Sequence, residues 1–253
     1  MRGRKFAKPG AKKVRRQGPK SKERWRMKGL KITDRKKYLF EKTFSEMEAF
    51  DAKYGLHEKA KKEYEIRNSD IRKPLATQAA IISTMQHYLG KLKGKKILQI
   101  AASSGNATLF LQKAKKARAF AIDLNIDAVK FGQKIGNKRY QRQDAANLKF
   151  RPNSMDAVII HNFLTPTYFA SLVNDNAVKA KTVNNSSKVL KKGGFLFIQN
   201  IDMTDPSFYR KYLENAGFKF KGHHKYGMSR KRYYNADILT GNFFEEVVVW
   251  QKV

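Results

Sequence analysis

Residues 97–108, ILQIAASSGNAT, form the segment of this chain whose residue types are best suited to holding a ligand. A short apolar run gives way to small residues around Gly105, and apolar residues then return at helical spacing. This pattern predicts a β-strand, a tight turn and the start of a helix. Because Ala101, Ser103 and Gly105 occupy little room, the backbone of the turn can approach a ligand closely. The segment favours a nucleotide-like ligand at the carboxyl end of a strand, and the alternative is an ordinary strand-to-helix loop.

The residues after this turn alternate between strand and helix patterns. Strands are expected at 118–122, 140–143, 155–160 and 195–199, and helices at 126–135 and 177–190. Gly193-Gly194 is expected to stop the second of these helices. Such alternation predicts an α/β fold with a doubly wound, mostly parallel sheet. Further helices are expected within 37–64 and at 77–89, the latter starting after Pro74.

The length and composition suit one globular domain from about residue 75 onward, preceded by an N-terminal extension, since the chain has 253 residues of which 41% are hydrophobic. The chain has no cysteine, which excludes disulfides, thiolate zinc sites and cysteine nucleophiles. Its five histidines have no spacing that suits a metal site on one helix, so no metal is expected. No apolar stretch approaches the ~20 residues of a membrane span, and we expect a soluble, intracellular protein.

The charge of the chain is strongly positive and unevenly distributed. There are 54 Lys and Arg against 21 Asp and Glu, a formal net charge of +33, which favours a polyanionic partner such as RNA. Residues 1–37 contain 17 Lys and Arg against Glu23 and Asp34, a net charge of +15. With few apolar residues and several Gly and Pro, this segment is expected to be a basic, flexible arm.

Two segments combine basic and aromatic residues and are predicted to bind RNA. In the arm, Trp25 could stack on an exposed base, and the phosphate contacts would come from Arg15, Arg16, Arg24 and Arg26. The alternatives for the arm are a merely solvating tail and an organelle transit peptide. The second segment is a loop at residues 223–234, HHKYGMSRKRYY, in which Arg230, Lys231 and Arg232 are the candidates. Its alternative is a plain solvated hairpin loop.

The order of elements over residues 75–253 resembles that of the class I S-adenosylmethionine-dependent methyltransferases. The resemblance implies a seven-stranded sheet, in which residues 218–221 begin the sixth strand and residues 244–249 form a closing antiparallel strand. It also implies S-adenosylmethionine as cofactor. We therefore divide the chain into a basic arm (1–37), a helical extension (38–74) and a methyltransferase-like domain (75–253).

The same resemblance assigns roles to individual residues. In that family the turn after the first strand holds the methionine part of the cofactor, which here implies Gln99, Ala101, Ser103, Gly105 and Asn106. An acidic residue after the second strand accepts hydrogen bonds from both ribose hydroxyls, and Asp123 has that position. A carboxylate suits a vicinal diol because its two oxygens can accept two bonds. The alternative role of Asp123 is to cap the helix that begins at residue 126, although Asn125 is better placed as that cap.

Two further groups of residues are implied at the same edge of the sheet. After the third strand, Asp144 and the backbone amide of Ala145 correspond to residues that contact the adenine, and the alternative is that Asp144 caps a short turn. After the fourth strand, His161 and Asn162 correspond to residues that line the methyl-transfer site. If a base takes part in the transfer, His161 is the candidate.

The turn also departs from the family pattern. Gln99 stands where the family has an acidic residue, which removes a negative charge facing the cofactor's ammonium and sulfonium groups. Ala101 and Ser103 replace two of the three usual glycines, and their Cβ atoms reduce the space for close approach. The sequence thus supports two hypotheses. The first is a methyltransferase acting on ribosomal or transfer RNA, and the second is a catalytically inactive relative that serves as an RNA-binding factor associated with the ribosome or its assembly.

Overall fold

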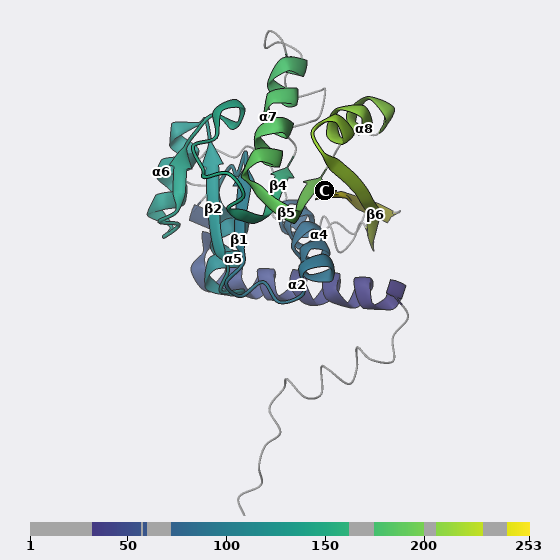
Figure 1. Ribbon diagram of the computed structural model, residues 1–253. Helices are drawn as coiled ribbons and strands as arrows, with labels where there is room; N and C mark the ends of the chain where they lie inside the picture. Colours follow the sequence, from purple (N-terminus) through teal and green to yellow (C-terminus); the bar gives the residue numbers. More distant parts are fainter. Residues whose placement is uncertain (1–31, 57, 60–71, 162–174, 200–205, 230–241) are drawn as a thin grey trace, which may run out of the picture. The chain divides into compact units, whose positions relative to one another are not determined.

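The computed structural model describes residues 32–56, 58–59, 72–161, 175–199, 206–229 and 242–253 (Figure 1). The chain divides into two units, Met1–Arg35 and Lys36–Val253. Of the first unit only residues 32–35 are described, and they begin helix α2 (Ile32–Tyr54). The remaining described residues belong to the second unit, which is an α/β domain.

Seven strands of the domain form one sheet in the order β3-β2-β1-β4-β5-β7-β6. Strands β1 to β5 pair in parallel, whereas β7 is antiparallel to both β5 and β6. The predicted doubly wound, mostly parallel seven-stranded sheet is therefore confirmed. The strands are β1 (Lys96–Ile100), β2 (Arg118–Asp123), β3 (Tyr140–Arg142), β4 (Met155–His161), β5 (Leu190–Gln199), β6 (Phe218–Ser229) and β7 (Asn242–Lys252).

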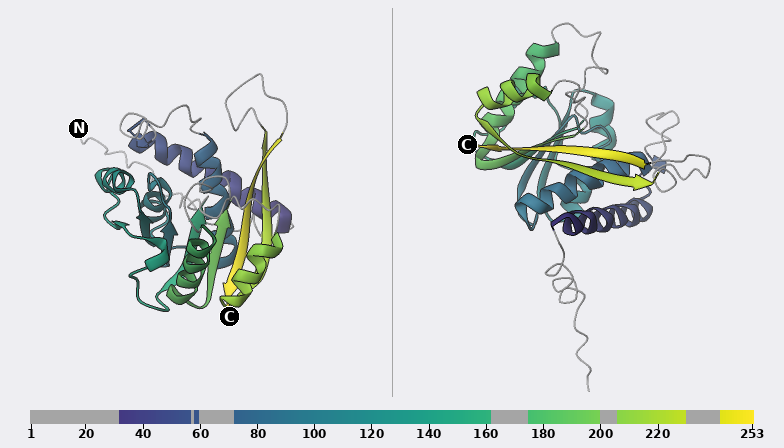
Figure 2. Two further views of the ribbon diagram at one scale, coloured as in Figure 1. Left: turned by 90° about the horizontal axis from the view of Figure 1, so that it is seen from above. Right: turned by 90° about the vertical axis from the view of Figure 1, so that its right-hand side faces the viewer.

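Helices cover both faces of this sheet (Figure 2). On one face α2 and α4 (Arg72–Leu89) pack with α5 (Asn106–Lys113) against alternate strand residues such as Ile97 and Ile159. On the other face α7 (Asp175–Val189) and α8 (Pro206–Asn215) contribute to a second cluster around Leu98 and Ile160. Helix α6 (Ile126–Lys134) packs beside β2 and β3, and the short 3-10 helix η1 (Ala145–Asn147) follows β3. Because both faces are covered, central strands are continuously apolar, as the MDAVII run predicts.

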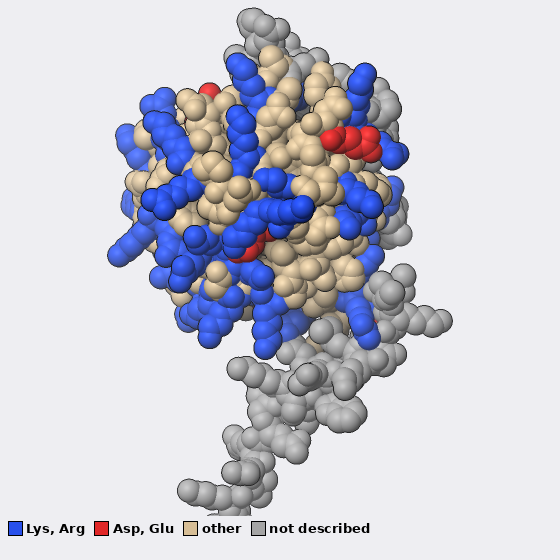
Figure 3. Space-filling model, in the orientation of Figure 1, with Lys and Arg blue, Asp and Glu red and all other residues tan. Residues whose placement is uncertain are grey.

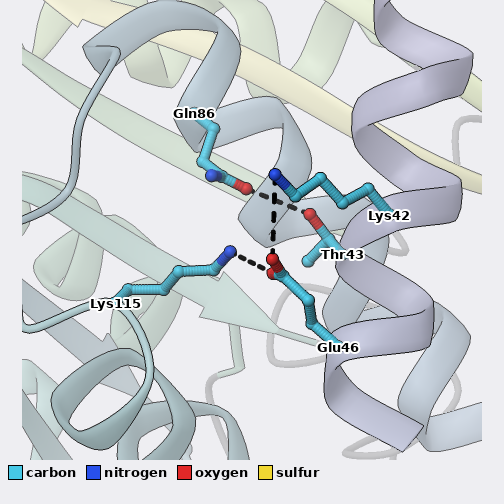
Figure 4. A network of polar contacts seen from close by, with 5 residues as sticks. All are labelled: Lys42, Thr43, Glu46, Gln86 and Lys115. Atoms are coloured by element: carbon cyan, nitrogen blue, oxygen red, sulfur yellow. Dashed lines mark hydrogen bonds and ion pairs between the residues drawn. The ribbon is translucent and has the colours of Figure 1, made fainter. Parts of the chain in front are cut away.

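Helix α2 is held on the domain by both apolar and polar contacts. Phe40, Phe44 and Met47 are buried in the cluster that α4 and α5 share. The hydroxyl of Thr43 donates to the side-chain oxygen of Gln86 on α4 over 3.0 Å, and the carboxylate of Glu46 forms an ion pair with Lys115, which precedes β2 (Figure 4). These contacts tie α2 to two separate elements of the domain.

Two sequence predictions about the last third of the chain were wrong. Helix α7 ends at Val189 and β5 begins directly at Leu190, so Gly193-Gly194 lie inside the strand instead of stopping the helix. Met155 of β4 pairs with Leu190 of β5, but Ala157 pairs with Phe195, so β5 has extra residues between these two pairs. Gly193 lies in this irregular stretch and has a φ of 77°. Residues 223–229 of the predicted basic loop belong to β6, because the hairpin of β6 and β7 pairs as far as Ser229 and Asn242.

Candidate functional site at the carboxyl edge of the sheet

The turn between β1 and α5 keeps a backbone shape that usually requires glycine. Ala101 and Ser103 have φ angles of 53° and 50°, and Gly105, which precedes α5, has a φ of 71°. These are the left-handed conformations that side chains disfavour by roughly 1–2 kcal/mol per residue. The turn is closed by a backbone hydrogen bond of 2.9 Å from Gly105 to the carbonyl of Ala102. Ala101 and Ser103, which stand where the family has glycines, therefore add side chains to the turn but keep its left-handed backbone.

Tyr140, the first residue of β3, packs against this turn. Its ring is almost fully buried, and its hydroxyl donates a hydrogen bond to the carbonyl oxygen of Ser103. A Cβ atom at Gly105 would lie 2.9 Å from the Cε1 atom of this ring, and one at Gly132 in α6 would lie 2.0 Å from its Cδ1 atom. Two glycines thus make room for a ring that fixes the turn. Tyr140 was not among the predicted site residues, because its only local signal is a large aromatic residue at the start of a strand.

Asp123 ends β2 and is fixed against the same turn. One carboxylate oxygen accepts a hydrogen bond of 2.9 Å from the backbone N–H of Ser103, and the other accepts one of 3.0 Å from the N–H of Asn125. Asn125 itself caps α6, accepting from Asp127 and Ala128 as expected, so the capping alternative for Asp123 is excluded. Each carboxylate oxygen retains a second lone pair, so the carboxylate can still accept bonds from a diol.

Asp144 lies at the same edge of the sheet. Asp123 and Arg142 are opposite each other in the parallel pair of β2 and β3, and Asp144 follows Arg142 by two residues. One oxygen of Asp144 accepts a hydrogen bond of 2.8 Å from Ala146 and caps η1. Asp144 therefore does cap a short turn, as the alternative predicts. Its other carboxylate oxygen can still accept a hydrogen bond, so the contact with adenine stays a prediction. Ala145, its neighbour, is buried.

Asn106 supplies a polar atom that the fold does not use. Its side-chain oxygen is buried and has no hydrogen-bond partner among the described residues, at the first position of α5 next to the turn. A buried acceptor of this kind is costly unless a donor reaches it, so it suits an ammonium or amide group of a ligand. Gln99 differs, because its side-chain oxygen accepts a hydrogen bond of 2.5 Å from the hydroxyl of Thr108.

His161 ends β4 and is oriented by a short chain of polar groups. The side-chain amide nitrogen of Gln199 donates to the carbonyl of Thr77 on α4 over 2.7 Å, so its oxygen faces Nδ1 of His161 at 3.2 Å. That oxygen can only accept, which places the proton on Nδ1 and leaves Nε2 as the basic nitrogen. Burial lowers the pKa of His161, and the smaller effect of the hydrogen bond to Gln199 opposes this, so the imidazole is neutral near pH 7.

Other predicted site residues lie outside the described part of the chain. These are Asn162 beside His161, the residues of the arm (Arg15, Arg16, Arg24, Trp25 and Arg26) and those of the hairpin (Arg230, Lys231 and Arg232). Among the described residues, no group of three or more His, Cys, Asp and Glu is arranged to hold a metal ion. Within the same residues, no helix is long and apolar enough to cross a membrane.

Residues 98–198, which contain this turn, Asp123, Asp144 and His161, match the family model described as "Methyltransferase domain". Over this segment the chain is similar to methyltransferase domains, which supports the resemblance to the class I S-adenosylmethionine-dependent methyltransferases. No curated protein matches the chain in sequence. The family match supports S-adenosylmethionine as its cofactor.

Several solved structures share the fold of the chain at low sequence identity. A SAM-dependent methyltransferase from Methanosarcina mazei is 17% identical with a TM-score of 0.51, over 67% of this chain and 97% of that one. TrmN from Thermus thermophilus is 15% identical with a TM-score of 0.50, over 70% of this chain and 49% of TrmN. The [4+2]-cyclase SpnF is 14% identical with a TM-score of 0.51, over 74% of this chain and 84% of SpnF. Because a cyclase shares the fold, the reaction must be argued from the site.

The residues at this edge fit the cofactor. Gly105 and Tyr140 give the turn its left-handed backbone, the unused oxygen of Asn106 can accept from an ammonium group, and Asp123 presents both carboxylate oxygens beside the turn. Of the three departures from the family pattern, Ala101 and Ser103 keep the left-handed backbone. At Gln99 a neutral amide replaces a carboxylate and is already hydrogen-bonded to Thr108.

Proposed function

We propose that this methyltransferase-fold protein transfers a methyl group from S-adenosylmethionine to RNA, with ribosomal or transfer RNA as the substrate. The observation that carries the proposal is the attachment of Asp123 to the turn through the N–H of Ser103, since it brings the residues predicted for the ribose and the methionine together. A net charge of +33 on 253 residues supports a polyanionic substrate. The predicted arm and hairpin residues would add phosphate and stacking contacts.

The chain's own residues would then orient the reaction and remove a proton. The bound cofactor supplies an electrophilic methyl group on a sulfonium, and transfer depends mainly on in-line placement of the nucleophile. As the bond from a nucleophilic atom of the RNA to the methyl carbon forms, the bond from that carbon to the sulfur would break, and the RNA atom would lose its proton. His161, neutral and with the proton on Nδ1, is suited to accept that proton at Nε2.

A second candidate function is RNA binding without catalysis. It is favoured by Gln99, whose amide has no charge to offer the cofactor and whose oxygen is taken by Thr108. In that case the protein would act as an RNA-binding factor in the ribosome or its assembly, and the fold would serve as a rigid platform.

Methyl transfer from radiolabelled S-adenosylmethionine to ribosomal and transfer RNA separates the two candidates. We expect incorporation with the wild-type chain, a loss of at least tenfold in His161→Gln, and little change in Lys130→Gln as a surface control. RNA binding without incorporation into either RNA would refute the enzyme and leave the platform. Failure to bind RNA at all would refute both.

A further inference from the structure

The sheet has a second edge, opposite the candidate site, at which its parallel strands begin. Four segments lie there: residues 90–96 before β1, 113–118 before β2, 137–139 before β3, and 188–192 at the start of β5. Their sequences are GKLKGKK, KAKKAR, NKR and KVLKK, so each contains at least two basic residues and none contains Asp or Glu. Backbone hydrogen bonds from Gly94 to Lys116 and from Arg118 to Lys95 hold the first two segments together.

Two described carboxylates close to the four segments are already paired with cations. Asp156 of β4 forms an ion pair of 2.6 Å with Lys191, and Glu46 of α2 pairs with Lys115. Although burial alone would raise it, the hydrogen bonds from Lys191 and from the N–H of Lys96 lower the pKa of Asp156, so this carboxylate is charged at neutral pH. The other basic residues of the four segments therefore leave a large excess of positive charge.

That excess is accessible to solvent. Lys93, Arg118 and Lys192 are exposed, and they stand before or at the start of β1, β2 and β5. Because β7 is antiparallel to β5, the end of β7 lies at the edge where β5 begins. Figure 3 views the domain from that side, and Lys and Arg gather on this face with few acidic residues between them. The described part of the candidate site, in contrast, presents the carboxylates of Asp123 and Asp144.

From this distribution of charge we propose that the amino-terminal edge of the sheet is a docking surface for the phosphate backbone of a folded RNA. The inference rests on the proposed function, which it extends by a binding surface and a substrate class. Four strand spacings of about 4.8 Å separate β3 from β5, so the row of basic segments is about 19 Å long and can contact several phosphates of a helix.

The position of this surface has a consequence for the substrate. The two edges are separated by the length of the strands, and the seven residues of β4 correspond to about 23 Å. An RNA that docks on the amino-terminal edge and also presents a nucleotide near His161 must extend around the domain. A short single strand is too small to bind both places firmly, whereas a folded RNA such as a ribosomal or transfer RNA can do so.

A charge-neutralising triple variant tests the surface in the full-length chain. Lys93→Gln, Arg118→Gln and Lys192→Gln together remove three charges from exposed positions at the edge. As a matched control, Lys53→Gln, Lys130→Gln and Lys181→Gln remove three charges from exposed helical positions. RNA binding is measured with transfer RNA and with a 12-nucleotide single strand over a range of salt concentrations. Cofactor binding is measured in parallel, because it should be the same in both triple variants.

We expect the edge variant to bind transfer RNA at least tenfold more weakly and to lower the slope of log affinity against log salt by about 2 to 3. The control variant should change both quantities much less, and the short strand should bind weakly to all three proteins. Equal losses in the two variants, or no loss in the edge variant while the wild type binds RNA, would overturn the surface and leave the proposed function standing. Edge-dependent binding to vesicles containing 30% phosphatidylserine, without RNA binding, would overturn both.

Discussion

Gly132→Ala provides a sensitive test of how Tyr140 connects α6 to the candidate site. In an ordinary helix this change gains about 1 kcal/mol of stability, because alanine is the better helix former. Here the added Cβ would lie 2.0 Å from the Cδ1 atom of Tyr140, whereas ordinary contacts begin at 3.4 Å. The ring would have to move by about 1.4 Å, but its hydroxyl is bound to the carbonyl of Ser103. Overpacking of this kind costs about 1–3 kcal/mol, so the sign of the effect should be reversed.

Urea denaturation of a double-mutant cycle measures this directly. Gly132→Ala should lower the free energy of unfolding by about 1–3 kcal/mol in the wild-type background, and should be neutral or stabilising by up to about 1 kcal/mol in a Tyr140→Leu background. Tyr140→Leu is expected to be destabilising by itself, which the cycle subtracts. If Gly132→Ala stabilises the wild-type chain, the ring does not pack between α6 and the turn as described, and our account of how the turn is held is wrong.

Three further predictions concern the turn, the region around β6 and the α2 network. Ser103→Gly should stabilise the fold by about 0.5 kcal/mol, since relief of the left-handed conformation (φ 50°) exceeds the added entropy of the unfolded chain, and a lower melting temperature would contradict this. His224 contacts the hydroxyl of Tyr88, and burial, followed by the charges of Lys36, His87 and His223, lowers its pKa from 6.5 to about 4. Between pH 6.5 and about 4 the unfolded chain therefore binds one more proton at His224 than the folded chain does. The free energy of unfolding should fall by about 1–2 kcal/mol as the pH drops from 7 to 4, and His224→Gln should reduce this fall in urea titrations. Thr43→Val should cost about 1 kcal/mol because the side-chain oxygen of Gln86 loses its donor, and an unchanged urea midpoint would argue against that contact.

The fold could be predicted because its signals are local. Runs such as MDAVII and the small residues around Gly105 define strands and the turn by themselves, and the spacing of apolar residues defines the helices between them. The boundary of β5 was predicted wrongly because Gly193-Gly194 look like a helix stop, whereas pairing with β4 extends the strand through them. Tertiary pairing there overrides a local signal.

The candidate site was only partly accessible to sequence reasoning. Asp123 and Asp144 were predicted to lie at one edge because each follows a strand, and the parallel register of β2 and β3 places them there. Tyr140 was not predicted, because its hydroxyl bonds to Ser103, which lies 37 residues away in the sequence, and the turn meets the ring only in the folded domain. Gln199 was missed for the same reason, since it links His161 to Thr77 across two strands and a helix.

Binding of S-adenosylmethionine, measured by calorimetry, tests the central claim most directly. The wild-type chain should bind the cofactor, and Asp123→Ala should weaken binding by about 10- to 100-fold, as expected for the loss of 1.5–3 kcal/mol from charged hydrogen bonds. Asp127→Ala, an exposed carboxylate in the first turn of α6, is the matched control and should bind as the wild type does. Equal affinity in the wild type and Asp123→Ala, or no binding by the wild type, would contradict the assignment of this edge as the cofactor site.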